Sequence, residues 1–291
     1  MIKNLLIVIL GLFLLFGCSS KEDKELKIVT NSWIGYAPLF YAKESGYLDN
    51  LGIKLITTVS LEEAFDIFSV GKADLVTTTQ HEYYALKKTF NSIKPVILID
   101  RSLGGDMIMS NISLDELKNA NKIDVFLEID SINSEILKTF IKKYKLDISK
   151  MNFIDGDQSE FQDIKNDKSR NILIVTYSPY NEPLNDSGFM ELVSTKDLDS
   201  IIVIDSICAT DKIINKYPDV LKKLKNVIDQ SIFEIENNKK DAYKKVSRYL
   251  NNISYEEFLA SLKKIRWINT PSDDLLNRIE PLKYKREYLI K

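Results

Sequence analysis

The sequence predicts an α/β fold in two lobes, with parallel-rich sheets flanked by helices and a helical C-terminal tail. Short apolar segments rich in β-forming residues alternate with amphipathic segments of about ten residues, which is the pattern of βαβ units. This alternation runs through residues 26–100 and again through residues 112–210, and the pattern beyond residue 210 is helical. The 291 residues also suffice for two moderate domains.

The first round of alternation has clear helix boundaries. Pro38 suits the first turn of a helix, and Gly71 follows the last residue of an amphipathic segment. The expected strands are residues 26–30, 53–59, 74–79 and 95–100, and the expected helices are residues 38–46, 61–70 and 81–90.

The second round begins with a helix start signal. Ser113 is followed three residues later by Glu116, which is a capping-box pattern. The expected strands are residues 122–129, 151–155, 171–177 and 201–210, and the expected helices are residues 112–120 and 134–146. Further helices are expected at residues 217–238, 241–250, 254–265 and 271–280.

The first residues of the chain predict export and a membrane anchor. Residues 5–16 form an apolar run of twelve residues after the basic Lys3. Such a run is shorter than the roughly 20 residues that span a bilayer, and it is typical of a secretory signal. The following Leu15-Phe16-Gly17-Cys18 resembles a lipobox, which implies lipidation of Cys18. An ordinary signal peptide with a chance cysteine is the alternative.

Composition excludes several classes of function. The 40 Lys and Arg nearly balance the 42 Asp and Glu, so the chain presents no basic field for a nucleic acid. Its only histidine is His81, and its only cysteines are Cys18 and Cys208, which is too few for a disulfide scaffold or a four-cysteine zinc site. We therefore expect no metal and no cofactor.

Two segments carry a family resemblance. They are NSWIGYAPLFYAKESGYLDNLGIKL (31–55) and VGKADLVTTTQHEYYAL (70–86). They resemble the opening of bacterial ABC-transporter solute-binding proteins of the nitrate, sulfonate, taurine and thiamine-precursor group. The resemblance implies a type II periplasmic-binding fold and a monomer that delivers a small molecule to an ABC permease and ATPase. Together with the lipobox-like segment, it implies a membrane-anchored lipoprotein of the cell envelope that faces the periplasm or the cell exterior.

The resemblance also sets the expected domain boundaries. Both chain ends form lobe 1 in this family, and the middle of the chain forms lobe 2. The chain is expected to cross over near 107–111 and to return near 201–205. The expected division is a signal peptide at 1–17, a tether at 18–25, lobe 1 at 26–110 plus 201–291, and lobe 2 at 111–200.

Candidate ligand-binding residues lie just beyond the expected strands, because ligands of open α/β sheets bind outside the carboxyl ends of strands. Trp33 offers an aromatic face beside Gly35, which lets a ligand approach the backbone. Each candidate also has a purely structural interpretation, such as core packing for Trp33 or helix capping for His81. The candidates are Trp33, Gly35, Tyr36, Thr78, Gln80, His81, Asp100, Glu128, Tyr177, Tyr180 and Asp205.

These residues favour a cationic or heteroaromatic ligand, such as an amine or a thiamine-precursor-like ring. Aromatic faces attract cations, and carboxylates pair with them. A sulfonate or nitrate would call for more arginine than Arg101 alone, which Asp100 and Asp106 could neutralise. Backbone N–H groups near Pro38 and Gln80 could still bind an oxyanion, so an anion binder remains the alternative.

An enzyme and a sensor-linked binding module are the alternatives to a transport protein. An enzyme is disfavoured because the chain lacks a phosphate-binding glycine loop, a zinc-protease motif and a nucleophile elbow. A binding module that reports to a sensor would have the same sequence features as a transport protein. The expected function is therefore solute binding for import, with sensing as the alternative.

Overall fold

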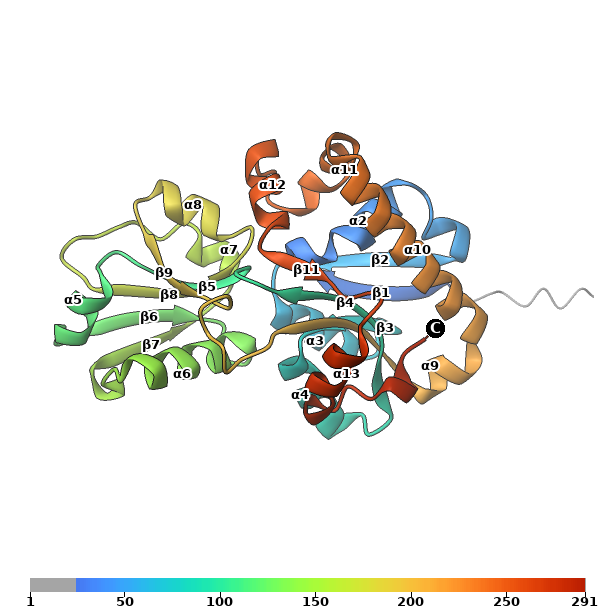
Figure 1. The fold of residues 1–291 in the computed structure, drawn as a ribbon, viewed down its shortest axis with the longest axis horizontal. Coiled ribbons are helices and arrows are strands. Elements are labelled where there is room, and N and C mark those ends of the chain that lie inside the picture. The colour runs from blue at the N-terminus through green and yellow to red at the C-terminus, as the bar shows by residue number, and fades with distance from the viewer. Residues whose placement is uncertain (1–24, 291) are drawn as a thin grey trace, which may run out of the picture.

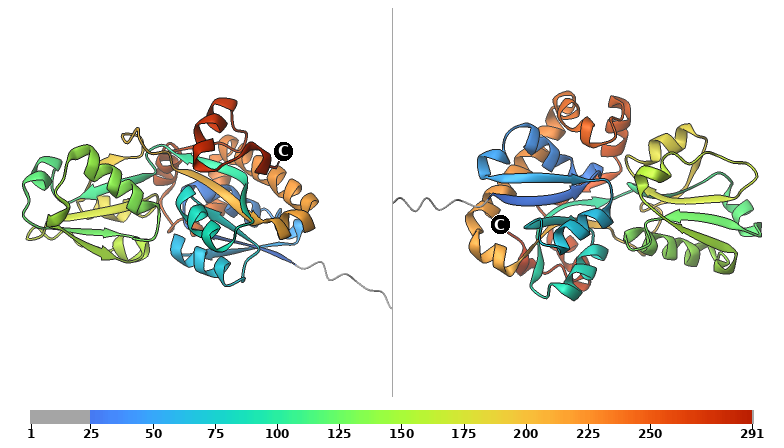
Figure 2. Two further views of the ribbon diagram at one scale, coloured as in Figure 1. Left: turned by 90° about the horizontal axis from the view of Figure 1, so that it is seen from below. Right: turned by 180° about the vertical axis from the view of Figure 1, so that it is seen from behind.

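The computed structural model describes residues 25–290, which form two β-sheets flanked by helices (Figure 1). The predicted signal peptide, most of the tether and Cys18 lie outside the described residues. The six-stranded sheet has the order β11-β4-β10-β3-β1-β2, and the five-stranded sheet has the order β7-β6-β8-β5-β9. We call the first sheet with its helices lobe 1 and the second sheet with its helices lobe 2. Figure 2 shows the two lobes side by side from two further directions.

Lobe 1 is built from both ends of the described chain. Its strands are β1 (Leu26–Asn31), β2 (Ile53–Thr58), β3 (Leu75–Thr78), β4 (Ile93–Ser102), β10 (Ile204–Thr210) and β11 (Ile265–Trp267). Its helices are α2 (Ala37–Glu44), α3 (Leu61–Ser69), α4 (Gln80–Thr89), α9 (Asp211–Lys216), α10 (Pro218–Asn237), α11 (Lys239–Val246), α12 (Tyr255–Leu262) and α13 (Asp273–Ile279). The predicted strands and helices of the first round are confirmed, with ends that shift by a few residues.

Lobe 2 holds the middle of the chain. Its strands are β5 (Asp106–Ser110), β6 (Ile123–Leu127), β7 (Met151–Asp155), β8 (Ile172–Tyr177) and β9 (Met190–Ser194), and its helices are α5 (Leu114–Asn119), α6 (Ile132–Tyr144), α7 (Gln158–Phe161) and α8 (Asn181–Asp186). The capping box of Ser113 and Glu116 is confirmed at the start of α5. The sequence did not predict β5, β9, β11, α7 or α8.

Both sheets are mixed, because the strands that arrive from the other lobe run against their neighbours. In lobe 1, β1 pairs in parallel with β2 and β3, whereas the returning β10 is antiparallel to both β3 and β4. In lobe 2, β6 is parallel to β7 and β8, whereas the entering β5 is antiparallel to β8 and β9.

The crossing between the lobes differs from the expected position near 107–111. Residues 106–110, which were counted in lobe 1, form strand β5 and pair with β8 and β9, so they belong to the sheet of lobe 2. The chain crosses at 103–105, where Gly104 has φ +109°, a conformation that favours glycine. The chain returns to lobe 1 after β9, and Thr195 at the start of this returning segment contacts the first crossing. Its Oγ1 lies 2.8 Å from Ser102 Oγ and accepts the Gly104 N–H at 2.8 Å.

The C-terminal helices complete lobe 1. Helix α10 turns an apolar stripe toward α2, and Leu221, Leu224, Ile228 and Ile235 on this stripe are fully buried. Their spacing of three, four and seven residues places them on one helix face. No helix within residues 25–290 is long and apolar enough to cross a membrane.

Candidate ligand-binding site

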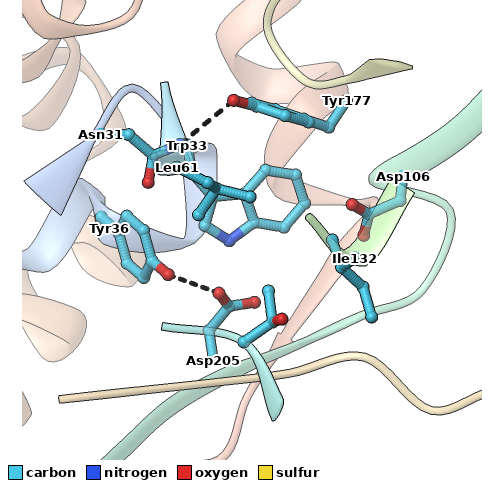
Figure 3. A pocket seen from close by; sticks show the side chains of 9 residues that line it. Asn31, Trp33, Tyr36, Leu61, Asp106, Ile132, Tyr177 and Asp205 are labelled. Carbon is cyan, nitrogen blue, oxygen red and sulfur yellow. Dashed lines mark hydrogen bonds between the residues drawn. The ribbon is translucent and has the colours of Figure 1, made fainter. Parts of the chain in front are cut away.

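A small cavity lies between the lobes, around the ring of Trp33 (Figure 3). Lobe 1 and lobe 2 both contribute to its wall. The free space for the centre of a water-sized sphere is about 10 Å³, roughly the room that one water molecule needs. The lining residues are Asn31, Trp33, Tyr36, Leu61, Thr79, Asp106, Ile132, Tyr177 and Asp205.

The strand ends explain how these side chains meet. Asn31 ends β1, and Trp33 and Tyr36 follow it in the loop that leads into α2. Tyr177 ends β8, while Asp106 begins the antiparallel strand β5 and is paired with Tyr177. In a sheet, the carboxyl ends of parallel strands lie at the same edge as the start of an antiparallel neighbour. Both lobes therefore present polar loops to the cavity.

Trp33 is held by two glycines. A Cβ on Gly35 would lie 2.0 Å from Asp100 Oδ2 and 2.3 Å from Trp33 Nε1, and a Cβ on Gly105 would lie 2.3 Å from Trp33 Cη2. Only glycine therefore permits the close approach of the indole to both loops. The Tyr177 ring meets the Trp33 ring edge to face, with centroids 5.9 Å apart.

Three aspartates give the cavity its charge. The Tyr36 hydroxyl donates a hydrogen bond to Asp205 Oδ1 at 2.6 Å. Trp33 Nε1 donates a hydrogen bond to Asp100 Oδ1 at 3.3 Å. The second oxygens of Asp100 and Asp106 are buried and have no hydrogen-bond partner among residues 25–290. None of the nine lining residues is Lys, Arg or His, so no cation on the wall neutralises the carboxylates.

Burial and mutual repulsion raise the pKa of all three carboxyls. Burial, and secondarily the charge of Asp100, raises the pKa of Asp205 well above its usual range. Burial likewise raises the pKa of Asp100 well above its usual range, and nearby Asp106 adds to the effect. The pKa of Asp106 rises to about 7, chiefly through burial. A cation that enters the cavity would favour the ionised form of all three.

Several hydrogen bonds join the lobes around the cavity. Asn31 Nδ2 donates to the Tyr177 hydroxyl at 3.2 Å. The Ile132 N–H of lobe 2 donates to Glu82 Oε1 of lobe 1 at 3.0 Å. His81 Nδ1 lies 3.1 Å from Glu135 Oε1, and this contact is the main reason that the pKa of His81 is raised. The lobes are therefore closed on each other.

The structure brings some predicted site residues together. Trp33, Tyr36, Tyr177 and Asp205 line the cavity, and Gly35 and Asp100 lie directly behind the Trp33 ring. Their contact with a ligand remains a prediction.

The other predicted residues lie outside the lining, and most of their side chains have hydrogen-bond partners elsewhere. Thr78 Oγ1 lies 3.2 Å from Cys208 Sγ in the core of lobe 1. The Gln80 amide bonds to the backbone of Ile202 and Ile204 and so fixes the returning strand. His81 lies at an interlobe contact, as described above, and Tyr180 donates to the Val59 carbonyl across the lobes at 3.0 Å. Glu128 is buried in lobe 2.

Sequence reasoning missed part of the lining. Asn31, Leu61 and Ile132 were not considered, and Thr79 and Asp106, which lie at or beyond the ends of expected strands, were not kept among the ligand-binding residues. Leu61 and Ile132 each follow a serine that caps a helix, and Thr79 itself caps α4 in a capping box. Such start signals locate loops at the end of a sheet, so they could have identified these positions.

Arg101 does not reach the cavity. It lines a separate hollow with Arg266 and Arg278, and burial followed by the charge of Arg278 lowers its pKa. The described part of the chain also contains no group of three or more His, Cys, Asp and Glu placed to hold a metal ion. The charge at the Trp33 cavity is therefore set by its carboxylates.

Solved structures with the same architecture are numerous and distant in sequence. The ligand-binding component of an ABC-type import system from Staphylococcus aureus, with zinc bound, aligns with a TM-score of 0.70 at 15% identity, over 91% of this chain and 96% of that chain. The alkanesulfonate-binding protein SsuA from Xanthomonas axonopodis pv. citri, bound to MOPS, aligns with a TM-score of 0.70 at 11% identity, over 93% and 97%.

A third structure, a conserved gene product of Candida albicans described as having the generic periplasmic binding protein fold, aligns with a TM-score of 0.67 at 13% identity over 89% of each chain. These similarities confirm the predicted two-lobe periplasmic-binding fold. A comparison with curated protein sequences finds no significant match. The sequence profile described as NMT1/THI5 like matches residues 33–242, which confirms the resemblance seen in residues 31–55 and 70–86. The chain belongs to the NMT1/THI5-like family.

Proposed function

We propose that the protein is the solute-binding component of an ABC importer and captures an organic cation between its lobes. The observation that carries the proposal is the Trp33 cavity, where aromatic rings and carboxylates meet without a basic side chain. The family and the fold support a binding role, since structures of the same fold include an import-system component and a sulfonate-binding protein. The proposed work is binding and delivery, with no bond made or broken.

The cavity chemistry favours a cation over an anion. Cation–π contact with Trp33 and pairing with Asp106 or Asp205 would both be strong in a buried site. At the start of α4 the acidic side chain of Glu82 accepts the Thr79 N–H and hydroxyl, and an acidic side chain at this position disfavours an oxyanion. A quaternary amine, a primary amine and a protonated heteroaromatic ring share the required features.

Capture would proceed by closure of the lobes over the ligand. The cavity is nearly filled in the closed arrangement, so a ligand must enter while the lobes are apart. The hydrogen bonds from the Ile132 N–H to Glu82 and from the Asn31 amide to the Tyr177 hydroxyl would then re-form around the ligand. Hinge closure around a ligand is an established mode of domain motion.

A thermal-shift screen tests the proposal directly. The purified protein is heated with quaternary amines, polyamines, thiamine-precursor pyrimidines, sulfonates and nitrate. A cation at 100 times its Kd should stabilise the fold by about 2.7 kcal/mol. Stabilisation by sulfonate or nitrate alone would overturn the cation assignment. The screen does not separate import from sensing, because a sensor protein would also bind a ligand but would have no partner permease.

We also propose that the protein is exported and tethered through lipidated Cys18, as a monomer facing the periplasm or the cell exterior. The lipobox-like segment before Cys18 supports this proposal, and it lies outside the described residues. Cys18→Ser should release the protein from membrane fractions, because a signal without a lipid acceptor leaves no anchor. Immunoblots of membrane and soluble fractions measure the effect, and retention of the variant on membranes would argue against lipidation.

A further inference from the structure

A second group of polar side chains is buried in lobe 2 beside the cavity. Glu128 follows strand β6, Thr176 lies in β8, Asn133 begins α6 and Gln158 begins α7. The parallel register of β6 and β8, which pairs Phe126 with Ile174, places Glu128 opposite Thr176. The exposed fraction of each side chain is 2% or less. We call these four residues the Glu128 cluster.

The Glu128 cluster is unusual because most of its side-chain polar atoms form no hydrogen bond of good geometry within the described chain. Both carboxylate oxygens of Glu128, both amide atoms of Asn133, Gln158 Oε1 and Thr176 Oγ1 make no such hydrogen bond among residues 25–290. Gln158 is fixed from its other end, since its Nε2 donates to the Val175 carbonyl at 3.1 Å. Unpaired buried polar atoms are strongly unfavourable, so a concentration of them indicates groups kept for a partner.

The cluster adjoins the Trp33 cavity. Asn133 follows Ile132, which lines that cavity and whose N–H donates to Glu82 Oε1 at 3.0 Å. The charge of Glu128 is the largest cause after burial for the raised pKa of Tyr177, which places the carboxylate near the phenol. Tyr177 is therefore influenced by the charges of both Glu128 and Asp106.

The partner that fits the cluster is a cation. Glu128, Asn133 Oδ1 and Gln158 Oε1 supply four acceptor oxygens, and an ammonium group has three donors and no acceptor. Burial, followed by the charges of Glu82 and Asp157, raises the pKa of Glu128 well above its usual range. The surroundings are therefore acidic, and an anionic ligand group would add to the repulsion.

We propose that the Glu128 cluster is a second cation subsite and that the ligand is a small dication of the α,ω-diamine class. One ammonium group binds at Asp106 and Asp205 against Trp33, and the other binds at Glu128. This inference rests on the proposed function and makes it more specific. It also accounts for the two carboxylates, Glu128 and Asp106, whose charges influence Tyr177.

Calorimetry with matched amines tests the inference. 1,4-Diaminobutane and longer diamines are compared with 1-aminobutane for the wild-type protein, Glu128→Gln and Asp130→Asn. Asp130 is an exposed carboxylate two residues away and serves as the control for long-range charge. The best diamine should bind the wild type at least about tenfold more tightly than the monoamine, since a charge-assisted pair is added. Glu128→Gln should remove most of this advantage, and Asp130→Asn should keep it.

Each outcome separates the inference from the proposed function. Equal affinity of diamine and monoamine for the wild type would overturn the second subsite while cation binding stands. An equal loss for both amines in Glu128→Gln would overturn it as well, because the effect would then be on folding or closure. If the wild type binds no diamine but binds a quaternary or heteroaromatic cation, the dication class is wrong and the proposed function remains. If no cation binds, the proposed function itself is wrong.

Discussion

Asp106→Asn is expected to lower the affinity for the cationic ligand about 100-fold at pH 8. Asp106 lines the cavity, its Oδ2 has no hydrogen-bond partner within residues 25–290, and its carboxyl points toward the Trp33 ring (Figure 3). Removing one partner of a buried charge pair costs about 2–5 kcal/mol, and about 1.4 kcal/mol corresponds to tenfold. Calorimetry at pH 8 measures the change. Asp219→Asn, an exposed carboxyl at the start of α10, is the control.

The same substitution should have the opposite effect on stability without ligand. The pKa of Asp106 is about 7 in the folded protein and about 4 in an unfolded chain. Between these values the folded state binds more protons, so stability falls as the pH rises from about 4 to about 7. Asp106→Asn cannot ionise and should therefore be more stable than the wild type at pH 8. Equal urea midpoints at pH 8 would show that Asp106 carries no buried charge.

The affinity of the wild type should follow the same titration. Below pH 7 Asp106 is protonated and a cation must displace the proton, so binding weakens as the pH falls. In Asp106→Asn this dependence should be reduced, although Asp100 and Asp205 also have raised pKa values.

The alternation of strands and helices was sufficient to predict the fold class. Segments 26–30 and 53–59 show their strand character through apolar and β-branched residues alone, and both were found as strands. Strand β5 was missed because DMIMS lies after two glycines and reads as a connection. The boundary between the lobes was therefore placed one strand too late, since local pattern does not show which sheet a strand joins.

The expectation that ligand-binding residues follow the carboxyl ends of strands identified the cavity only in part. It selected Trp33 and Tyr177 correctly as residues that line the cavity, but it also selected Thr78, whose side chain turns into the core toward Cys208. Successive strand residues point to opposite faces, and sequence position does not reveal which face holds the ligand. Asp106 was considered only as a residue that could neutralise Arg101, because the sequence does not show that it starts a strand and reaches the cavity through antiparallel pairing with Tyr177.

Closure of the lobes gathers like charges, and this explains why a cation would control it. Glu62 of lobe 1 has a raised pKa through burial and the charge of Asp155 in lobe 2. Within the cavity, Asp205 of lobe 1 and Asp106 of lobe 2 also repel each other. Without a cation, closing brings Asp205 and Asp106 together in a buried site that screens their repulsion weakly, whereas water screens the exposed Glu62 and Asp155. A cation removes that repulsion only in the closed state, so its binding shifts the population toward closure.

Trp33→Ala is expected to weaken both the fold and ligand binding. Trp33 is only 4% exposed and packs with Ile34, Tyr36 and Tyr177 in the main core, so truncation leaves a large cavity. Phe and Trp truncations in cores lower the free energy of unfolding by about 3–5 kcal/mol. Urea denaturation measures this loss.

Binding is separated from stability by comparing Trp33→Ala with Trp33→Phe under conditions where circular dichroism shows both folded. The phenyl ring keeps an aromatic face for the cation but cannot donate to Asp100 as Trp33 Nε1 does. Trp33→Phe should therefore retain affinity within about tenfold, whereas Trp33→Ala should lose about 30-fold or more, because a desolvated cation–π contact is worth about 2 kcal/mol. Equal affinities of alanine and wild-type proteins would exclude a cation–π contact with Trp33, leaving the carboxylates as the sole source of cation selectivity.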